Sequence, residues 1–372
     1  MPPELTALDT VALALALIHF TTPLTYYYYM RRKYLNKPWG LSINPGFQPR
    51  VTIIIPTYMG AKYIASRLDN IREQNYPSDK VEIIVVDSAS SDGTREIVEK
   101  WIKQNPDVKA MLITEPERRG KLSAVLEGLK HLSRDSEIIV LTDDDCLWEA
   151  NALQSVVKYF SDPSVGVVSG SIRYLKNKGV DNTYREFYNK IRVAESKWWS
   201  TPVHNGPLLA LRRSILDKIG IPYFPGADDS AFASYIAFAG YRAIQVDDVW
   251  VYEPVAGRQY RRMVRRATHL LTYFTSLKKY VKKQGVYVKT RFDRIWHIEA
   301  YLHIFNPFLL AVAVALLIAS AIMGSTTAII LLITGAILLA IKPYRAWIQS
   351  QLYLLIAAFR SLVAREEAWS RN

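Results

Sequence analysis

The 372-residue sequence contains very little cysteine and histidine. Cys146 is its only cysteine, and there are six histidines. A single thiol cannot form a disulfide within the chain, and it cannot supply the several thiolates of a metal cluster. Cys146 follows an apolar run, so we interpret it as a small core residue rather than as a nucleophile. The sequence shows no internal repeat and no low-complexity tract, and its length leaves room for one or two domains.

Charged residues make up 22 % of the chain, yet two long stretches contain none. The first is Thr10 to Met30, and the second is Ala300 to Ile341, interrupted only by a Gly-Ser-Thr turn at 324–326. Roughly 20 apolar residues are enough to cross a bilayer. We therefore predict an N-terminal transmembrane helix within residues 1–36 and a transmembrane hairpin within 299–342.

The positive charges next to these stretches indicate an orientation. The cluster that begins at Arg31 follows the first apolar stretch, whereas a cleaved signal peptide carries its charges before it. Lys342 and Arg345 follow the second stretch. The positive-inside rule then places residues 37–257 at the cytoplasmic face of the cell membrane. For residues 343–372, we favour a helix at the membrane interface over a further span.

Acidic residues are nearly missing between Arg258 and Arg294, where twelve lysines and arginines accompany only Asp293. An apolar stripe of helical spacing runs from Met263 to Val281, with most of the arginines off the stripe. Such a basic segment implies an anionic partner, which is phosphate, lipid head groups or nucleic acid. Because it adjoins the predicted hairpin, we interpret residues 258–298 as basic amphipathic interface helices on the lipid bilayer, with no nucleic acid bound.

Residues 37–257 have the composition of a soluble α/β domain. Apolar runs that are typical of buried strands alternate with amphipathic stretches that are typical of helices. The expected strands are 51–55, 81–86, 110–114 and 138–141, and the expected helices are 63–74, 94–104 and 121–132. This alternation predicts a doubly wound, mainly parallel sheet.

The strand at 138–141 leads directly into Asp143, Asp144 and Asp145. Open parallel sheets bind ligands at the carboxyl ends of their strands. On an extended segment Asp143 and Asp145 would project the same way and could hold one hard cation. An acidic loop after a strand is the alternative explanation.

Three other stretches would lie at the same edge. Pro56-Thr57-Tyr58 ends the first strand, and Asp87 ends the second, where a carboxylate can bind a base or a ribose. Asp92 is better explained as a cap of the following helix. Lys121 follows Arg118-Arg119-Gly120 at a helix start, which suits phosphate, although a solvated basic turn would look the same.

The order of these motifs resembles the family 2 glycosyltransferases of the GT-A fold. Two later stretches extend the resemblance, which covers about residues 50–265. Gly226-Ala227-Asp228-Asp229 is similar to the segment that supplies the catalytic base, and Gln259-Tyr260-Arg261-Arg262-Met263 is similar to a Gln-x-x-Arg-Trp segment of the membrane-embedded, cellulose-synthase-like branch.

The resemblance implies a role for each matching residue. Asp229, with Asp228 beside it, would be the catalytic base of an inverting transfer; a plain acidic pair at a helix N-terminus is the alternative. Mn²⁺ or Mg²⁺ would be held by Asp143 and Asp145. The donor nucleotide-sugar would be bound by Pro56, Thr57, Tyr58, Asp87, Lys121, Asp143, Asp144, Gln259 and Arg262. The acceptor would be bound by Gly206 and Trp199, although Trp199 could equally serve core packing or membrane anchoring. His204 would be either an additional metal ligand or a loop histidine without a role in binding.

Two departures from the family pattern bear on the reaction. Thr-Glu is replaced by Ala227-Asp228, and the Trp that the branch associates with a growing polymer is replaced by Met263. We therefore expect a single hexose transfer to a lipid-linked acceptor, such as a polyprenyl or dolichyl phosphate, and favour GDP-mannose over UDP-sugars as donor. The alternatives are a processive polysaccharide synthase, a membrane nucleotidyltransferase and a non-catalytic anion-binding scaffold.

Overall fold

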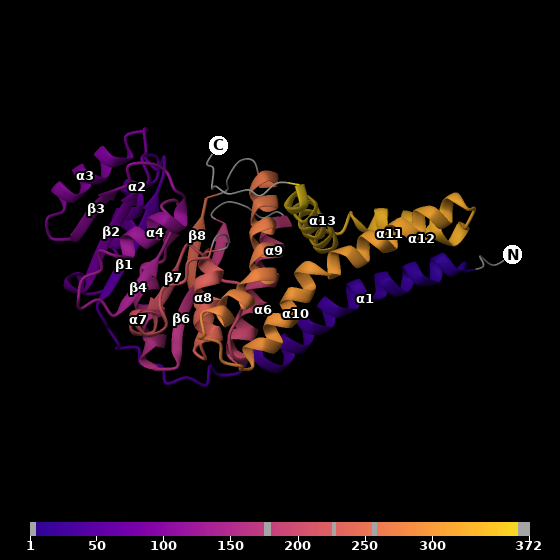
Figure 1. The fold of residues 1–372 in the computed structure, drawn as a ribbon, viewed down its shortest axis with the longest axis horizontal. Helices are drawn as coiled ribbons and strands as arrows, with labels where there is room; N and C mark the ends of the chain where they lie inside the picture. The colour runs from indigo at the N-terminus through magenta and orange to yellow at the C-terminus, as the bar shows by residue number, and fades with distance from the viewer. Residues whose placement is uncertain (1–4, 175–179, 225–227, 255–258, 364–372) are drawn as a thin grey trace.

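The computed structural model describes residues 5–174, 180–224, 228–254 and 259–363. An α/β domain carries a helical extension that projects from one side, with the N-terminal helix running along it (Figure 1). The extension consists of the apolar helices at the two ends of the chain. This arrangement agrees with a catalytic domain joined to a membrane region.

One eight-stranded sheet forms the centre of the domain, in the order β3-β2-β1-β4-β7-β6-β8-β5. β3, β2, β1 and β4 are parallel, as predicted, and β6 is parallel to β8. β7 runs antiparallel to β4 and β6, and β5 runs antiparallel to β8, so the second half of the sheet is mixed rather than parallel. The strands are β1 Val51–Thr57, β2 Val81–Asp87, β3 Lys109–Thr114, β4 Ile138–Leu141, β5 Leu147–Trp148, β6 Val165–Tyr174, β7 Leu209–Arg212 and β8 Arg242–Glu253.

Helices cover both faces of this sheet and bury two hydrophobic cores. Successive residues of a strand alternate between the cores, so Ile54 and Val86 lie in one and Ile53 and Val85 in the other. Every residue of β1 is buried, which explains its continuous apolar run. The covering helices are α2 Ile64–Arg72, α3 Thr94–Gln104, α4 Lys121–Leu129, α5 Ala152–Val157, α6 Val180–Trp198, α7 Arg213–Ile219 and α8 Asp228–Phe238.

The remaining helices form the extension and its junction with the domain. Two continuous helical segments, Ala7–Leu35 and Phe292–Ile322, are long and apolar enough to cross a membrane. Thr326–Leu338 and the helix after it are bent by 106° and would count as a third span only together. The helices are α1 Ala7–Met30, α9 Gln259–Lys283, α10 Phe292–Ile304, α11 Asn306–Ile322, α12 Thr326–Leu338 and α13 Lys342–Val363.

The predicted hairpin therefore differs from the structure in its second arm. α12 has 13 residues, which corresponds to about 20 Å of helix, whereas the hydrocarbon core of a bilayer is about 30 Å thick. α13 turns away after this short arm and packs against α9 and against α6 of the α/β domain. This position is consistent with the interface helix predicted for residues 343–372, of which 364–372 lie outside the described part.

α1 is bound to the hairpin along its length. Near the start of α1, Asp9 accepts a hydrogen bond of 2.7 Å from the hydroxyl of Ser325, which lies at the α11–α12 turn. Farther along, His19 Nδ1 lies 2.9 Å from the Asn306 carbonyl. The segments predicted to cross the membrane thus form one helical bundle, although they come from opposite ends of the chain.

Candidate active site

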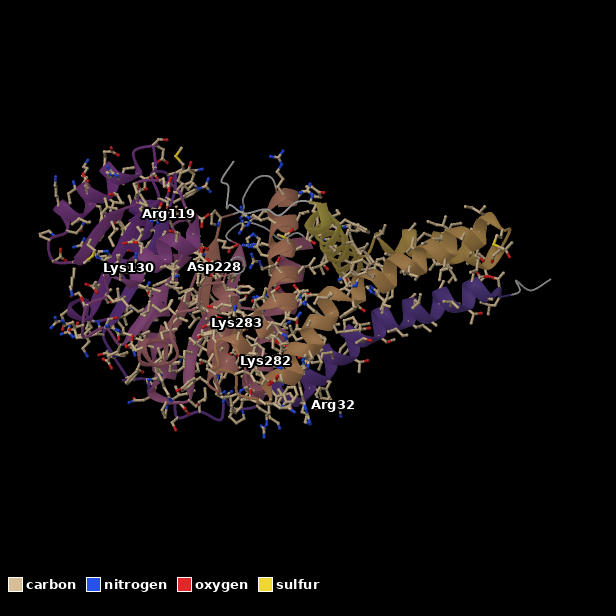
Figure 2. All side chains as sticks on the ribbon, viewed as in Figure 1. Arg32, Arg119, Lys130, Asp228, Lys282 and Lys283 are labelled. Atoms are coloured by element: carbon tan, nitrogen blue, oxygen red, sulfur yellow. The ribbon has the colours of Figure 1, made fainter. Side chains whose placement is uncertain are left out.

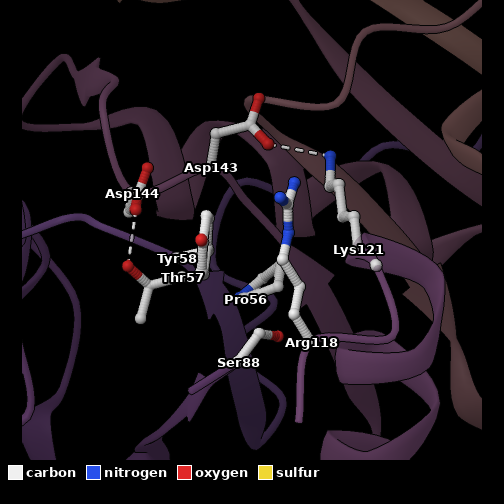
Figure 3. Close-up of a pocket in the computed structure, with 9 residues that line it drawn as sticks. Pro56, Thr57, Tyr58, Ser88, Arg118, Lys121, Asp143 and Asp144 are labelled. Carbon is white, nitrogen blue, oxygen red and sulfur yellow. Dashed lines mark hydrogen bonds and ion pairs between the residues drawn. The ribbon is translucent and has the colours of Figure 1, made fainter. Parts of the chain in front are cut away.

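The parallel strands bring the predicted donor residues to one edge of the sheet. Thr57 is paired with Asp87, and Ile54 with Leu141, so β1, β2 and β4 end side by side. A pocket lies beyond these ends (Figure 3). Its lining residues are Pro56, Thr57, Tyr58, Ser88, Arg118, Gly120, Lys121, Asp143 and Asp144.

The three consecutive aspartates do not continue the strand. β4 ends at Leu141, and Asp144 and Asp145 lie in a turn. Asp143 contacts Lys121 Nζ at 2.8 Å, whereas Asp144 is buried and accepts a hydrogen bond of 2.6 Å from the Thr57 hydroxyl (Figure 3). The premise that residues 143–145 form an extended segment was therefore wrong, and the pairing of Asp143 with Asp145 at one cation stays a prediction. Asp144 supports the end of β1.

The chemistry of the carboxylates fits a hard divalent cation. Among the described residues, no group of three or more His, Cys, Asp or Glu side chains could hold a metal ion. Mg²⁺ and similar ions are commonly bound by one or two carboxylates together with substrate phosphates. Asp143 and Asp145 are the predicted pair, and the donor diphosphate would complete the site.

Lys121 connects this pair to the predicted base. It is the first residue of α4 and follows Gly120, whose φ of 93° is in the region that favours glycine. Its Nζ lies 2.8 Å from Asp143, 3.5 Å from Asp229 and 4.0 Å from Asp228. Burial opposes its charge, but the three carboxylates raise the pKa of Lys121 well above its usual value.

Asp229 lies at the start of α8, facing Lys121. Burial, assisted by the neighbouring charges of Asp228 and Asp143 and opposed by Lys121, raises the pKa of Asp229 to about 7. Gly206 packs directly against it, because a Cβ at residue 206 would lie 2.2 Å from Asp229 Oδ2. The predicted catalytic and acceptor-side residues are thus in contact.

Replacing Gly206 with alanine tests this contact. The added methyl would overlap the carboxylate, so either the 204–206 loop or Asp229 must move. A displacement of about 1 Å can cost about 100-fold in rate. We expect Gly206→Ala to lower kcat by that order while metal-dependent nucleotide binding persists, as measured by steady-state kinetics and thermal shift. Normal turnover of this variant would contradict the close packing.

The raised pKa of Asp229 also predicts a pH dependence of stability. The folded protein binds this proton more tightly than the unfolded chain, so the contribution of Asp229 is complete below its ordinary pKa of 3.8 and is lost as the pH rises through about 7. Asparagine does not titrate. The Tm of Asp229→Asn relative to wild type should therefore rise between pH 6 and pH 8, while the exposed control Asp217→Asn shows no such change. A pH-independent difference would contradict the assignment.

Two aspartates near the first strands have separate environments. Asp87 is buried; its Oδ2 accepts a hydrogen bond from Ser90 N, while Oδ1 has no hydrogen-bond partner among the described atoms. A buried acceptor of this kind suits a donor group of a ligand. Asp92 accepts hydrogen bonds from the backbone N–H groups of Ala61 and Thr94, so it contacts the start of α3. The N-cap residue of α3 is Gly93, so Asp92 lies one residue before the position predicted for it.

Two of the residues considered for the site have clear structural contacts. Trp199 packs against the hydrophobic core with the Arg242 guanidinium 5.6 Å from its ring, which agrees with the packing alternative, and its role at the acceptor stays a prediction. His204 is buried, with Nδ1 2.8 Å from the Ser169 hydroxyl and Nε2 2.9 Å from the Thr201 carbonyl. Both ring nitrogens are engaged, and burial lowers the pKa of His204 to about 3, which identifies it as a neutral loop histidine.

Arg262 is held by an acid that the sequence analysis missed. Glu253 ends β8 and is buried, and its carboxylate lies 2.9 Å from both Arg262 and Arg185 and 3.6 Å from Arg266. Although burial favours protonation, these arginines lower the pKa of Glu253 to about 2. The position of Glu253 at the carboxyl end of a strand could have indicated its importance from the sequence. Gln259 begins α9, but its side chain lies outside the described residues.

Comparisons with known proteins agree with this geometry. The sequence profile of Glycosyl transferase family 2 matches residues 52–220. Glycosyltransferase AglE of Haloferax volcanii is 30 % identical over 149 residues, which are 40 % of this chain and 47 % of the relative. Poly-beta-1,6-N-acetyl-D-glucosamine synthase of Staphylococcus aureus is 31 % identical over 156 residues, 41 % of this chain and 35 % of the relative. The matches thus span less than half the length of these curated relatives.

A solved structure is similar over almost the whole chain. The mannosyltransferase PcManGT from Pyrobaculum calidifontis, in complex with GDP-Man and Mn²⁺, is 44 % identical, with a TM-score of 0.86. The similarity covers 95 % of this chain and 99 % of that structure. Together with the family profile, it shows that the chain belongs to the family 2 glycosyltransferases of the GT-A fold and is a metal-dependent glycosyltransferase.

Proposed function

We propose that the protein transfers one mannosyl unit from GDP-mannose to a lipid-linked acceptor, with inversion, at the cytoplasmic surface of a membrane. The observation that carries this proposal is the contact of Lys121 with both Asp143 and Asp229. A single cation thereby joins the carboxylate edge, where a diphosphate would bind, to a partly buried carboxylate that can accept a proton. The similarity to a solved mannosyltransferase that holds GDP-Man and Mn²⁺ supports mannose as the sugar.

On the donor side, the pocket offers contacts for the nucleoside and for the diphosphate of a sugar nucleotide. Asp87 Oδ1 is available to a base or ribose donor, and the Arg118 guanidinium lies 4.0 Å from the Tyr58 ring at the pocket wall. Lys121 would bind the diphosphate. Asp143 and Asp145 would hold Mn²⁺ or Mg²⁺, which when bound offsets the charge that develops on the leaving diphosphate.

On the acceptor side, Asp229 would act as the base. The acceptor hydroxyl forms a bond to the anomeric carbon as the bond to the diphosphate breaks, and its proton passes to the Asp229 carboxylate. A single displacement of this kind inverts the anomeric centre. A pKa of about 7 makes this carboxylate a much stronger base than an ordinary aspartate and suits it to neutral pH.

The helical extension supports a membrane-bound acceptor. We assign residues 1–36 and 299–342 to the membrane, 37–257 to catalysis, and 258–298 and 343–372 to its interface. Arg32, Lys282 and Lys283 are exposed and lie toward the end of the catalytic domain from which α1 and α10 project (Figure 2). Cations at this level favour anionic lipid head groups and a cytoplasmic orientation.

A transfer assay tests this proposal. The full chain in lipid nanodiscs would receive Mn²⁺, polyprenyl phosphate and GDP-mannose labelled in the sugar. We expect one lipid-soluble product carrying a single mannose, with release of GDP and no product in EDTA. Transfer from UDP-glucose or UDP-GlcNAc instead would contradict the assigned donor, and release of pyrophosphate would indicate a nucleotidyltransferase.

A processive polysaccharide synthase is the second candidate. It is favoured by the similarity of 156 residues to poly-beta-1,6-N-acetyl-D-glucosamine synthase. Against it, Met263 stands where the synthase-like branch has the tryptophan expected at a growing polymer. In the same assay, a ladder of products of increasing length would identify the synthase.

A further inference from the structure

A pair of buried acids lies where α1 joins the catalytic domain. Glu195 of α6 and Glu299 of α10 are 1 % and 4 % exposed, and their side chains interact. The Tyr26 hydroxyl of α1 donates to Glu195 Oε1 at 2.6 Å, and the Thr201 hydroxyl donates to Oε2 at 2.7 Å. The helix predicted to anchor the protein thus contacts a polar group inside the catalytic domain.

Arg192, three residues before Glu195 on α6, connects this pair to the loop beside Asp229. Burial raises the pKa of the Glu195 carboxyl, and the Arg192 charge is among the groups that oppose this rise, so the two side chains interact electrostatically. Arg192 NH1 also donates a hydrogen bond of 2.9 Å to Asn205 Oδ1. Asn205 is held from its other side, because its Nδ2 donates to Gln245 Oε1 at 3.0 Å.

The loop held by Arg192 forms one wall of the space around Asp229. Gly206 follows Asn205 and leaves no room for a Cβ beside Asp229 Oδ2. His204 N donates a hydrogen bond of 3.0 Å to the Ser230 hydroxyl, which joins the loop to the residue after Asp229. A shift of Asn205 is therefore transmitted to Asp229 through direct contacts at two neighbouring residues.

We propose that Arg192 is a positioning residue for the catalytic base, and that Tyr26 of the membrane helix α1 supports it through Glu195. This inference rests on the proposed role of Asp229. Arg192 holds Asn205 by a charge-assisted hydrogen bond, and the acid pair balances the arginine charge within the domain. The donor pocket is built from β1, β2, β4 and α4, with none of these residues among its lining side chains. Disturbing Arg192 should therefore slow turnover without weakening donor binding.

Steady-state kinetics on the full chain in nanodiscs would test the inference. Arg192→Met is expected to lower kcat by about 10- to 100-fold, the range associated with misplacement of a reacting group, with the KM for GDP-mannose changed less than about threefold. Arg192→Lys, which keeps the charge and one donor, should recover part of this loss. Tyr26→Phe, which removes only the hydroxyl, should lower kcat to a smaller extent.

Coupling between partners separates positioning from general destabilisation. Asn205→Ala should lower kcat like Arg192→Met, and the double variant should lose little more, because both changes break the same contact. Arg213→Met is the matched control: Arg213 is a partly buried arginine bound to carbonyls of the 133–136 turn, so its loss should leave kcat unchanged. Each variant would first be shown to bind GDP with Mn²⁺ by thermal shift.

The outcomes distinguish this inference from the proposed function. If Asp229→Asn is inactive while Arg192→Met and Tyr26→Phe keep wild-type kcat, the positioning role is overturned and the base assignment stands. Additive losses in the double variant, or a loss expressed in KM alone, would also overturn it. If Asp229→Asn keeps wild-type kcat, the proposed base itself is wrong.

Discussion

Asp229→Asn is expected to lower kcat by about 100- to 10,000-fold, the range associated with loss of a general base. Asparagine has nearly the same shape, so the space next to Gly206 stays filled, but it cannot accept the proton of the acceptor hydroxyl. Binding of GDP with Mn²⁺ should persist, because Asp229 is not among the residues that line the donor pocket. Single-turnover measurements of mannosyl transfer, with binding measured in parallel, would check both expectations.

The control for this prediction is Asp228→Asn. Asp228 lies 4.0 Å from Lys121 Nζ, farther than the 3.5 Å of Asp229, so its loss should cost less. Equal losses would indicate that the two acids act only through their charge on Lys121. Turnover by Asp229→Asn at the wild-type rate would remove the base from the mechanism.

Asp145→Ala should abolish metal-dependent nucleotide binding. A site built from two carboxylates and substrate phosphates loses half of its protein ligands with this change. Loss even of groups that merely orient metal ligands typically costs 10- to 100-fold in metal affinity, so we expect the Kd for GDP in Mn²⁺ to rise by more than about 100-fold. Calorimetric titration with Mn²⁺, Mg²⁺ or EDTA would measure it.

Asp143→Ala provides a second test of the same site. It also removes the ion pair of 2.8 Å with Lys121. It should therefore weaken metal-dependent nucleotide binding and also displace the Lys121 side chain. Asp135→Ala removes an exposed acid of a surface ion pair and should change neither. GDP affinity that is the same in EDTA as in Mn²⁺ would contradict a metal at these carboxylates.

The first half of the sheet was predictable because its strands are buried on both faces. A continuous apolar run bounded by turn residues indicates such a strand directly, and the helix at 94–104 and the strand at 138–141 have the predicted bounds. The parallel order of β1, β2, β3 and β4 follows from the intervening helices. The clustering of Thr57, Asp87, Lys121 and Asp143 is a consequence of that order.

The second half depends on contacts that a sequence pattern does not contain. β7 is inserted antiparallel between β4 and β6, although it follows β6 in the chain. The turn at Asp144 and the burial of that side chain depend on the close approach of Gly60, where a Cβ would lie 2.5 Å from Asp144 Oδ2. Glu253 was missed because its arginine partners belong to α6 and α9, far apart in the sequence.

The membrane region shows the same distinction between composition and geometry. The absence of charge between 300 and 341 indicates apolar surroundings but does not indicate where a helix bends. α12 and α13 are bent by 106°, and α13 packs against α9 and α6. Trp347 of α13 donates a hydrogen bond of 2.9 Å to His19 of α1, a contact between the two ends of the chain.

The most direct test of the account is binding of GDP-mannose by the purified full chain, measured by thermal shift with Mn²⁺ and with EDTA. A ligand that binds only the folded protein raises its apparent stability. We predict a rise in Tm with GDP-mannose or GDP that requires the metal, with little or no rise for UDP-glucose and UDP-GlcNAc. A metal-dependent rise with a UDP-sugar alone, or no rise with any of these ligands, would contradict the proposed GDP-mannose-dependent transfer.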